Sequence, residues 1–444
     1  MTQHFLDRIA KLDPTLHAFA HLDAVGALEQ ARRAEQEVAS GGSLGPLHGV
    51  PFAVMDLIRV KGLPSAEWMT DSATRDDVHV ERLRKAGAIV FGTLASYFFE
   101  PDEQPRNPWD TSRDPGNSSR GSASAVSAGM LPFTLAADGA GSTRLPAAWN
   151  GVLGLHPSRG LIPHVDFENP SLLLTTSFGP VTRDARDSAI VTQALAGPDG
   201  RDFVVIQDPP RDYLACLDDG VAGLRFAWTD DFGWSSIHNR DETPAVVAAA
   251  RKAAFEFRSL GGFVDYTPEV WEDSFSVMTT LGGVFEAMGY KAPISPSEVQ
   301  VRAAKLDEAL GLEPQPATTL PELPTPSAAE YEQATAVRER LWDTTTRVLS
   351  DNDIIASPTT LLLPKTLVEW GLLGRDSTFM SYCAHTAMFN LLGFPALTIP
   401  CGFIDGLPVG MQLATRPGRE DLLFQAAKSF LDAFPQQARP PAAS

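Results

Sequence analysis

The chain has little cysteine, no excess of basic residues and no long hydrophobic run. Its 444 residues include only three cysteines, and its formal net charge is −19. These cysteines lie far apart, so neither a disulfide framework nor a metal site built on cysteine is expected. A nucleic-acid partner would need a basic stripe, and none is visible. We also expect no membrane contact, because no apolar run reaches the roughly 18 residues that a spanning helix needs.

The N-terminus also lacks the basic start and apolar stretch of a secretory signal. Together with the scarce cysteine, this favours a cytoplasmic protein. The acidic balance indicates solubility and carries no information on fold. Hydrophobic residues make up 43% of the chain, which is enough for a large core.

Short apolar runs alternate with longer helical patterns along most of the chain. Helices are expected over Asp23–Ala39 and Asp76–Ala86, and a third from Thr243 to Gly261. Strands are expected over Pro51–Ile58, Ala88–Phe91, Leu131–Ala136, Leu224–Trp228, Ile354–Ala356 and Ala396–Ile399. This alternation predicts an α/β fold with a mainly parallel or mixed sheet.

The stretch from about residue 265 to 345 differs from the rest. It is rich in helical patterns, and Pro314–Pro326 holds many prolines, which indicates an irregular surface excursion. Strand signals before and after it read as parts of one sheet. We therefore expect a single domain over residues 1–444, with 265–345 as a helical insertion.

The most informative block is rich in serine and glycine. It runs from Pro115 to Val126 and continues from Leu135 to Ala148. Its first half reads as a turn that opens a helix of small residues. Its second half reads as a strand that ends in a glycine-rich turn, where Ser142 is exposed among free backbone N–H groups. This is the arrangement of a nucleophile beside an oxyanion hole.

With its flanking segments, this block resembles the amidase signature family, which includes fatty acid amide hydrolase and allophanate hydrolase. The resemblance covers about residues 20–205 and 350–432. It rests on the serine block and on Gly45–Pro51, Asn107–Asp110, Gly151–Gly160, Gly179–Arg183, Leu195–Asp199, Phe389–Ala396 and Gly406–Leu413. It implies an amidase-signature fold, in which a large mixed β-sheet core is flanked by helices on both faces. It also implies that the insertion at 265–345 forms part of the substrate pocket.

The resemblance implies acyl-transfer chemistry at this block. Ser142 corresponds to the acyl-accepting nucleophile, and Ser118 to the bridging serine that follows a cis peptide and relays the proton. The oxyanion would be bound by backbone N–H groups of Gly139, Ala140 and Gly141. Asn117 and Ser119 would contact the substrate. In the family, a neutral lysine takes the proton from the bridging serine.

Met55 occupies the position of that lysine. A thioether neither takes nor gives a proton at neutral pH, and a positioned base is worth about 10²–10⁴ in rate. Asn117, Arg120 and Ala140 also depart from the family pattern. Several changes around one site indicate a naturally diverged site, not a single inactivating substitution.

Five residues are candidate substitutes for the lysine. They are Lys61, Asp56, His156, His48 and His385, and ordinary structural roles are expected for each. Asp56 neighbours Met55, but adjacent strand residues point to opposite faces. Arg144 is expected to brace the nucleophile loop through a salt bridge.

Three functions follow from these observations. The first is an amidase-like serine enzyme that hydrolyses the C–N bond of a small non-peptide amide with a triad lacking lysine. The second is an inactive homologue that binds an amide-like ligand or a partner. The third is a biosynthetic enzyme that forms or cyclises amides. No cofactor and no metal are expected in any of them, and we allow for a homodimer.

Overall fold

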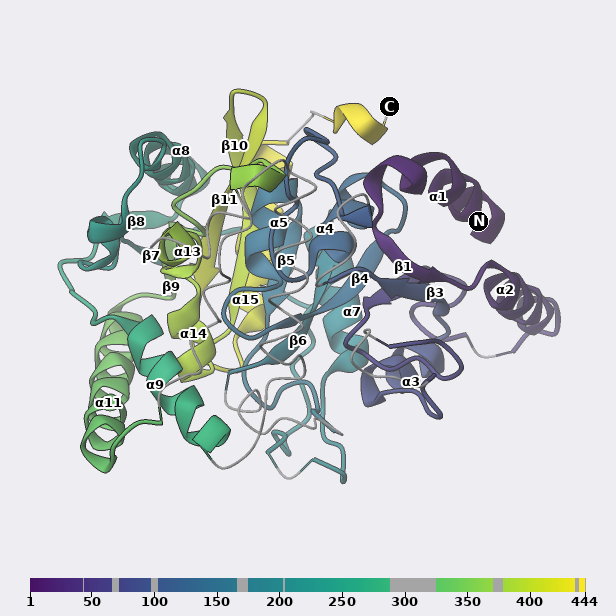
Figure 1. Cartoon of the computed structure of the whole chain (residues 1–444), viewed down its shortest axis with the longest axis horizontal. Coiled ribbons are helices and arrows are strands. Elements are labelled where there is room, and N and C mark those ends of the chain that lie inside the picture. The colour runs from purple at the N-terminus through teal and green to yellow at the C-terminus, as the bar shows by residue number, and fades with distance from the viewer. Residues whose placement is uncertain are drawn as a thin grey trace.

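The protein is described by a computed structural model. It describes residues 1–42, 44–65, 72–96, 103–165, 175–202, 204–287, 325–369, 378–435 and 439–443, with backbone only for 283–287, 378 and 379. Its centre is one 11-stranded sheet in the order β1-β3-β2-β4-β6-β5-β10-β11-β9-β7-β8 (Figure 1). The strands are β1 Phe19–Leu22, β2 Pro51–Met55, β3 Ile89–Leu94, β4 Phe133–Asp138, β5 Leu153–His156, β6 Ser177–Thr182, β7 Arg225–Trp228, β8 Phe263–Tyr266, β9 Ile354–Pro358, β10 Ala396–Ile404 and β11 Leu407–Ala414.

The sheet is mixed, as expected. Strand β2 runs parallel to β3 and β4, and β7 runs parallel to β8 and β9, whereas the strands between these two groups pair antiparallel. Strands from both halves of the sequence therefore share one sheet.

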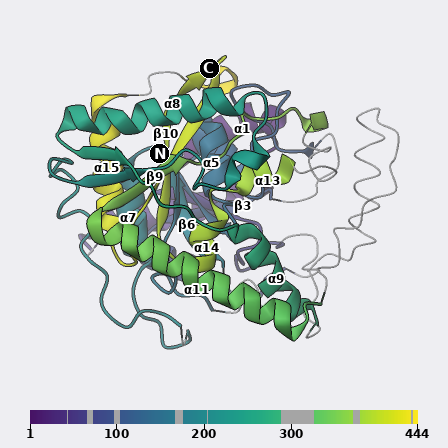
Figure 2. The same ribbon diagram turned by 90° about the vertical axis from the view of Figure 1, so that its left-hand side faces the viewer.

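Helices cover both faces of this sheet. Figure 2 places α7 and α15 on one side of the strands and α5 and α13 on the other. The helices are α1 Thr2–Leu16, α2 Ala24–Ala39, α3 Val78–Lys85, α4 Arg120–Ser127, α5 Arg144–Asn150, α7 Ala185–Leu195, α8 Thr243–Glu256, α9 Ser274–Ala287, α11 Ala328–Asp351, α13 Thr378–Cys383, α14 Ala387–Leu392 and α15 Glu420–Ala433, with the 3-10 turns η2 Ser235–His238, η3 Phe257–Leu260 and η4 Pro441–Ala443. Within the described ranges, no helix is both long and apolar enough to cross a membrane.

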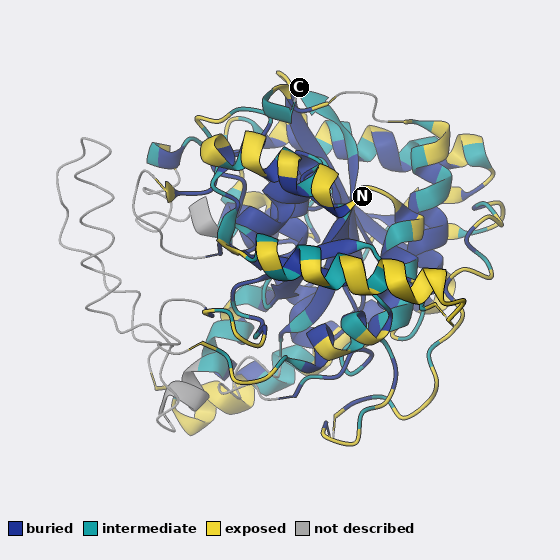
Figure 3. Cartoon of the chain, turned by 90° about the vertical axis from the view of Figure 1, so that its right-hand side faces the viewer, coloured by how far each residue is buried: buried dark blue, intermediate teal, exposed yellow. Residues whose placement is uncertain are grey.

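Local sequence explains the clearest of these elements. Helix α2 is rich in Ala, Glu, Gln and Arg, and the Asp23 side chain caps it by accepting the N–H of Gly26 at 2.9 Å. Every residue of β2, β3 and β4 is buried, because helices lie on both faces of these strands. Figure 3 shows the strands as the buried centre of the molecule, beneath helices with exposed outer faces.

Two expected boundaries shift. Strand β2 ends at Met55 and not at Ile58, because the N–H of Ile58 turns back to donate to the C=O of Met55 at 2.8 Å. The helix expected from Thr243 to Gly261 is α8 followed by the 3-10 turn η3, and Gly261 ends it with φ 89°. In the region 265–345, α9 and α11 are helical as expected, whereas residues 314–324 lie outside the described residues.

The topology brings the predicted site together. Because β2 and β4 are parallel neighbours, with Val54 opposite Leu135, their carboxyl ends meet at one edge of the sheet. Met55 ends β2, and Asp138 ends β4 immediately before the glycine turn. The carboxyl edge of parallel strands is where α/β folds place ligands.

Candidate active site

The nucleophile turn, defined as Gly139–Ser142, joins β4 to α5. Gly141 adopts φ +119°, and a Cβ there would lie 2.2 Å from Thr386 Oγ1. Only glycine fits this position, because a side chain would meet both backbone strain and a steric clash. The turn leaves Ser142 partly exposed while the residues that follow it are buried.

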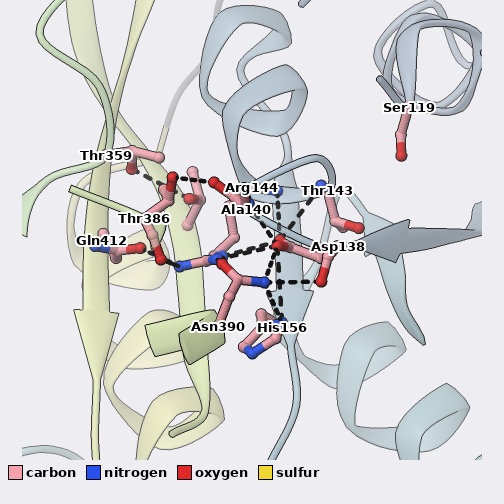
Figure 4. A network of polar contacts seen from close by, with 12 residues as sticks. Ser119, Asp138, Ala140, Thr143, Arg144, His156, Thr359, Thr386, Asn390 and Gln412 are labelled. Atoms are coloured by element: carbon pink, nitrogen blue, oxygen red, sulfur yellow. Dashed lines mark hydrogen bonds and ion pairs between the residues drawn. The ribbon is translucent and has the colours of Figure 1, made fainter. Parts of the chain in front are cut away.

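A buried carboxylate organises this turn from beneath. Asp138 accepts the Nε–H of Arg144 at 2.9 Å, the N–H of Gly141 at 2.7 Å and the side-chain amide of Asn390 at 2.8 Å. Arg144 and Asp138 are both fully buried. Figure 4 shows Arg144 and Asn390 converging on Asp138. The expectation that Arg144 braces the loop is confirmed.

The network reaches two elements from the C-terminal part of the chain. Arg144 Nη1 donates to Gln412 on β11 at 2.6 Å and to the C=O of Thr386 at 3.2 Å. Thr386, which precedes α14, donates its hydroxyl to the C=O of Ala140 at 2.6 Å. The nucleophile turn is thus tied to segments about 250 residues away in sequence, as the pairs 144–386 and 140–386 are separated by 242 and 246 residues.

The charges in this network are fixed by burial and pairing. Burial alone would raise the pKa of Asp138, but the Arg144 guanidinium reverses this effect, so the pKa is lowered overall. His156 lies with Nδ1 3.7 Å from Asp138. Burial lowers the pKa of His156 to about 3, against the attraction of Asp138. The site therefore holds an ionised Asp138 and a neutral His156 at pH 7.

The predicted oxyanion donors differ from one another. The N–H of Gly141 already donates to Asp138. The N–H groups of Gly139 and Ala140 make no hydrogen bond within the described part of the chain. They are free to receive an oxyanion, as the prediction for these two residues requires.

The second serine-bearing segment is the serine loop, defined as Gly116–Arg120, which leads into α4. The Asn117–Ser118 peptide bond is cis, as the family resemblance implies. The N–H of Ser119 donates to the C=O of Ser142 at 3.1 Å, and the N–H of Arg120 donates to the C=O of Ser118 at 2.9 Å. The serine loop and the nucleophile turn are therefore joined through the main chain.

Met55 lies beside this loop and is fully buried. Its Sδ atom is 3.5 Å from the Oγ of Ser119, which is also 3.5 Å from the C=O of Ala137. Sulfur is a weak acceptor, so both contacts are weak. The hydroxyls of Ser118 and Ser142 donate no hydrogen bond to any other described residue. Within the described ranges, no group is therefore positioned to accept a proton from the hydroxyl of either serine.

The two changed residues of the serine loop have different surroundings. Arg120 points to Asp114, with Nη2 3.3 Å from its carboxylate, and donates to Gln104 at 2.7 Å. Burial raises the pKa of Asp114, and Arg120 opposes that rise. Arg120 therefore supports the loop. The side-chain oxygen of Asn117 is buried and accepts no hydrogen bond from the described residues.

The candidate substitute bases lie in other contacts. Lys61 is exposed and lies outside β2. Asp56 is buried and accepts hydrogen bonds from the N–H and hydroxyl of Ser96. His48 binds the C=O of Ala34 at 3.1 Å.

The two remaining candidates, His385 and His156, are buried and neutral histidines. His385 contacts the Ser235 hydroxyl at 2.7 Å and the C=O of Pro358 at 2.9 Å, and burial lowers its pKa to about 4. His156 belongs to the Asp138 network. None of the five candidates makes a hydrogen bond to Ser118 or Ser142 in the described structure.

Sequence reasoning did not assign roles to Thr386, Asn390, Gln412 or Tyr382. Asn390 and Gln412 fall in segments that carried the family resemblance, so a signal for them existed, but no pattern linked them to Asp138. Such a link requires the fold. Among the described residues, no group of His, Cys, Asp or Glu has the arrangement of a metal site.

Comparison with known proteins identifies the family of this chain. The chain matches the Amidase family over residues 1–424. It is 30% identical over 469 aligned residues to an acylamidase from Rhodococcus erythropolis, covering 100% of this chain and 94% of that protein. It is 31% identical over 481 residues to a glutamyl-tRNA(Gln) amidotransferase subunit of Methylococcus capsulatus, covering 100% and 95%.

Solved structures give the same result. A bacterial aryl acylamidase of the amidase signature family superimposes with a TM-score of 0.81 at 22% identity, covering 100% of this chain and 94% of that one, which shows the fold. The native peptide amidase from Stenotrophomonas maltophilia has a TM-score of 0.79 at 28% identity, with coverage of 99% and 94%. By sequence profile, relatives and architecture, the chain belongs to the amidase signature family.

Proposed function

We propose that this chain is an amidase-type acyl-transfer enzyme that hydrolyses the C–N bond of a small, non-peptide amide through Ser142, with a triad that lacks lysine. The observation that carries the proposal is the intact nucleophile turn. Gly141 is held by Asp138, and the N–H groups of Gly139 and Ala140 are left without partners among the described residues. A preorganised turn of this kind is suited to binding a tetrahedral oxyanion.

In the proposed reaction, Ser142 Oγ attacks the amide carbonyl and its proton passes to Ser118, while the hydroxyl proton of Ser118 passes in the same step to the amide nitrogen, so that Ser118 stays neutral. The developing oxyanion is bound by the N–H groups of Gly139 and Ala140. The C–N bond then breaks, the protonated nitrogen leaves as the neutral amine, and water releases the acid from the acyl-enzyme. Met55 cannot assist this transfer, so we expect a slow reaction compared with an enzyme that has a positioned base.

Asn117 and Ser119 are proposed to contact the substrate. Support comes from their place in the serine loop, on either side of Ser118. Ser119 contributes a hydroxyl with only weak contacts. We further propose that the insertion at 265–345 completes the pocket and that the protein acts in the cytoplasm on its own or as a homodimer.

A second candidate function is an inactive homologue that binds an amide-like ligand. The contact between Met55 and Ser119 favours it, because a thioether fills the place where a base is required. The two functions share the pocket and differ in whether Ser142 reacts.

The Met55→Lys variant separates them. A lysine at this position supplies a base, so labelling of Ser142 by a fluorophosphonate probe, and amide hydrolysis, should rise by about 10²–10⁴. Met55→Leu is the matched control, since leucine has a similar size and no base, and Ser142→Ala should abolish labelling in every background. Intact-protein mass spectrometry gives the labelled fraction.

Measurable hydrolysis by the natural chain, lost in Ser142→Ala, supports the enzyme. Activity that appears only in Met55→Lys supports the inactive homologue. Absence of labelling in both the natural chain and Met55→Lys contradicts Ser142 as the nucleophile.

A further inference from the structure

Tyr382 occupies an unusual place beside the serine loop. It lies on α13, and its side chain is 1% exposed. Its hydroxyl accepts the N–H of Asn117 at 2.8 Å and donates to the C=O of the same residue at 3.3 Å. A single side chain thus satisfies both main-chain polar groups of Asn117. Buried main-chain groups need such partners.

The residue held in this way carries Ser118. Asn117 precedes Ser118 across the cis peptide. Gly116, on the other side of Asn117, has φ +96°, and a Cβ there would lie 2.7 Å from the Tyr382 hydroxyl. The hydroxyl is therefore fitted closely against the main chain of the serine loop, with no room for a side chain between them.

The ring of Tyr382 contacts the other half of the site. Its centroid lies 4.7 Å from that of Trp149, at an interplanar angle of 51°. Trp149 is on α5, the helix that follows Ser142, and its Nε1–H donates to the C=O of Leu362 at 3.0 Å. Tyr382 therefore touches both the loop that carries Ser118 and the helix that follows Ser142.

We propose that Tyr382 is a positioning residue for acyl transfer, whose hydroxyl holds Asn117 so that Ser118 stays in register with Ser142. This rests on the proposed function of Ser142 as the nucleophile. Burial raises the pKa of Tyr382 and keeps its hydroxyl protonated, as its hydrogen bond to the C=O of Asn117 requires. The side chain acts through the geometry of the serine loop.

The test is Tyr382→Phe, which removes the hydroxyl and keeps the ring. We make it in the natural chain and in Met55→Lys, and measure fluorophosphonate labelling of Ser142 as a maximal rate and a half-saturating probe concentration. The maximal rate should fall roughly tenfold to hundredfold, because small misplacements of reacting groups have effects of this size. The half-saturating concentration should stay within about twofold, since the probe pocket keeps its shape.

The matched control is Tyr213→Phe. Tyr213 is also 1% exposed, but its ring packs edge-on against Phe424 of α15, on the opposite face of the sheet. Ser142 in this variant should be labelled at the same rate as in the natural chain. If both variants slow labelling equally, the effect of Tyr382 is general destabilisation and the proposal is overturned.

Hydrogen exchange provides a second readout that does not depend on Ser142. The peptide containing Asn117 should exchange faster in Tyr382→Phe, whereas peptides from α15 should be unchanged. Unaltered exchange at Asn117 overturns the Tyr382 proposal alone. Absence of labelling in the natural chain and in Met55→Lys contradicts the proposed function, and the exchange data still show whether Tyr382 holds the loop.

Discussion

The two sides of the candidate site are held very differently. On the nucleophile side, Asp138 and Arg144 are fully buried and joined by hydrogen bonds of 2.9 and 3.0 Å, and further bonds tie them to α14 and β11. On the other side, the buried Met55 belongs to the hydrophobic core, and its polar contact in the described structure is a weak one with Ser119 at 3.5 Å. One side is fixed by buried charge, and the other is filled by an apolar side chain.

This difference separates a part of the site that needs precise polar partners from a part that needs only apolar packing. Burying a charged pair requires precise partners, so the network persists only while each member is present. Met55 is a buried apolar side chain within the hydrophobic core, which the fold accepts readily. The nucleophile turn therefore keeps its shape with an apolar residue at position 55.

The largest loss of stability is expected from Arg144→Met, on the nucleophile side. It leaves Asp138 buried without its guanidinium, so the free energy of unfolding should fall by about 3–5 kcal/mol. Urea unfolding followed by fluorescence measures the change. Arg186→Met is the control, because its pair with Asp218 is exposed at the surface, and its midpoint should be nearly unchanged. Similar midpoints for both variants would refute a special role for the buried pair.

Lowering the pH should reduce the stability of the folded protein, because His156, on the nucleophile side, is kept neutral by folding. Burial lowers its pKa to about 3 from the ordinary 6.5, so between these values the unfolded chain binds a proton that the folded chain excludes. The contribution of His156 to stability is complete above pH 6.5. As the pH falls from there toward 3, it is lost at about 1.4 kcal/mol per pH unit.

Urea unfolding at pH 7, 6 and 5 measures how the free energy of unfolding changes with pH. His156→Asn should reduce this slope by the contribution of one proton, about 1.4 kcal/mol per pH unit. His385, whose pKa is lowered to about 4, contributes in the same direction and remains in the variant. A slope unchanged by His156→Asn would show that His156 is protonated in the folded protein.

The smallest effect is expected on the other side of the site. Met55→Leu keeps the volume and the apolar surface, so stability should change by less than about 1.5 kcal/mol. The same urea titration measures it beside Arg144→Met. A loss as large as that of Arg144→Met would mean that Met55 is as tightly specified as the charged network, and the contrast between the two sides would disappear.

Much of the fold could be predicted because its signals are local. Asp23 caps α2, the apolar runs at Pro51 and Ala88 lead into β2 and β3, and Gly261 ends the helical stretch from Thr243. The end of β2 differs from the sequence prediction by three residues. An apolar run continues through Ile58, and only the main-chain hydrogen bond back to Met55 ends the strand there.

The site was predictable to a lesser extent. Glycines around Ser142 and the pair Ser118–Ser119 are contiguous signals, and their positions on the serine loop and the nucleophile turn follow from them. Thr386, Asn390, Gln412 and Tyr382 could not be assigned, because each acts on residues roughly 250 positions away. Sequence spacing contains no information on such contacts.

By itself, the sequence determined the family and the α/β architecture, and it led to the proposal that Met55 stands at the position of the family's base, since each depends on which residue follows which. Tertiary structure decided how the charges are partnered. It placed Arg144 on Asp138, Arg120 on Asp114 and the Tyr382 hydroxyl on Asn117. The physical reason is that a buried polar group must find its partner wherever the chain passes, and only the folded chain sets where that is.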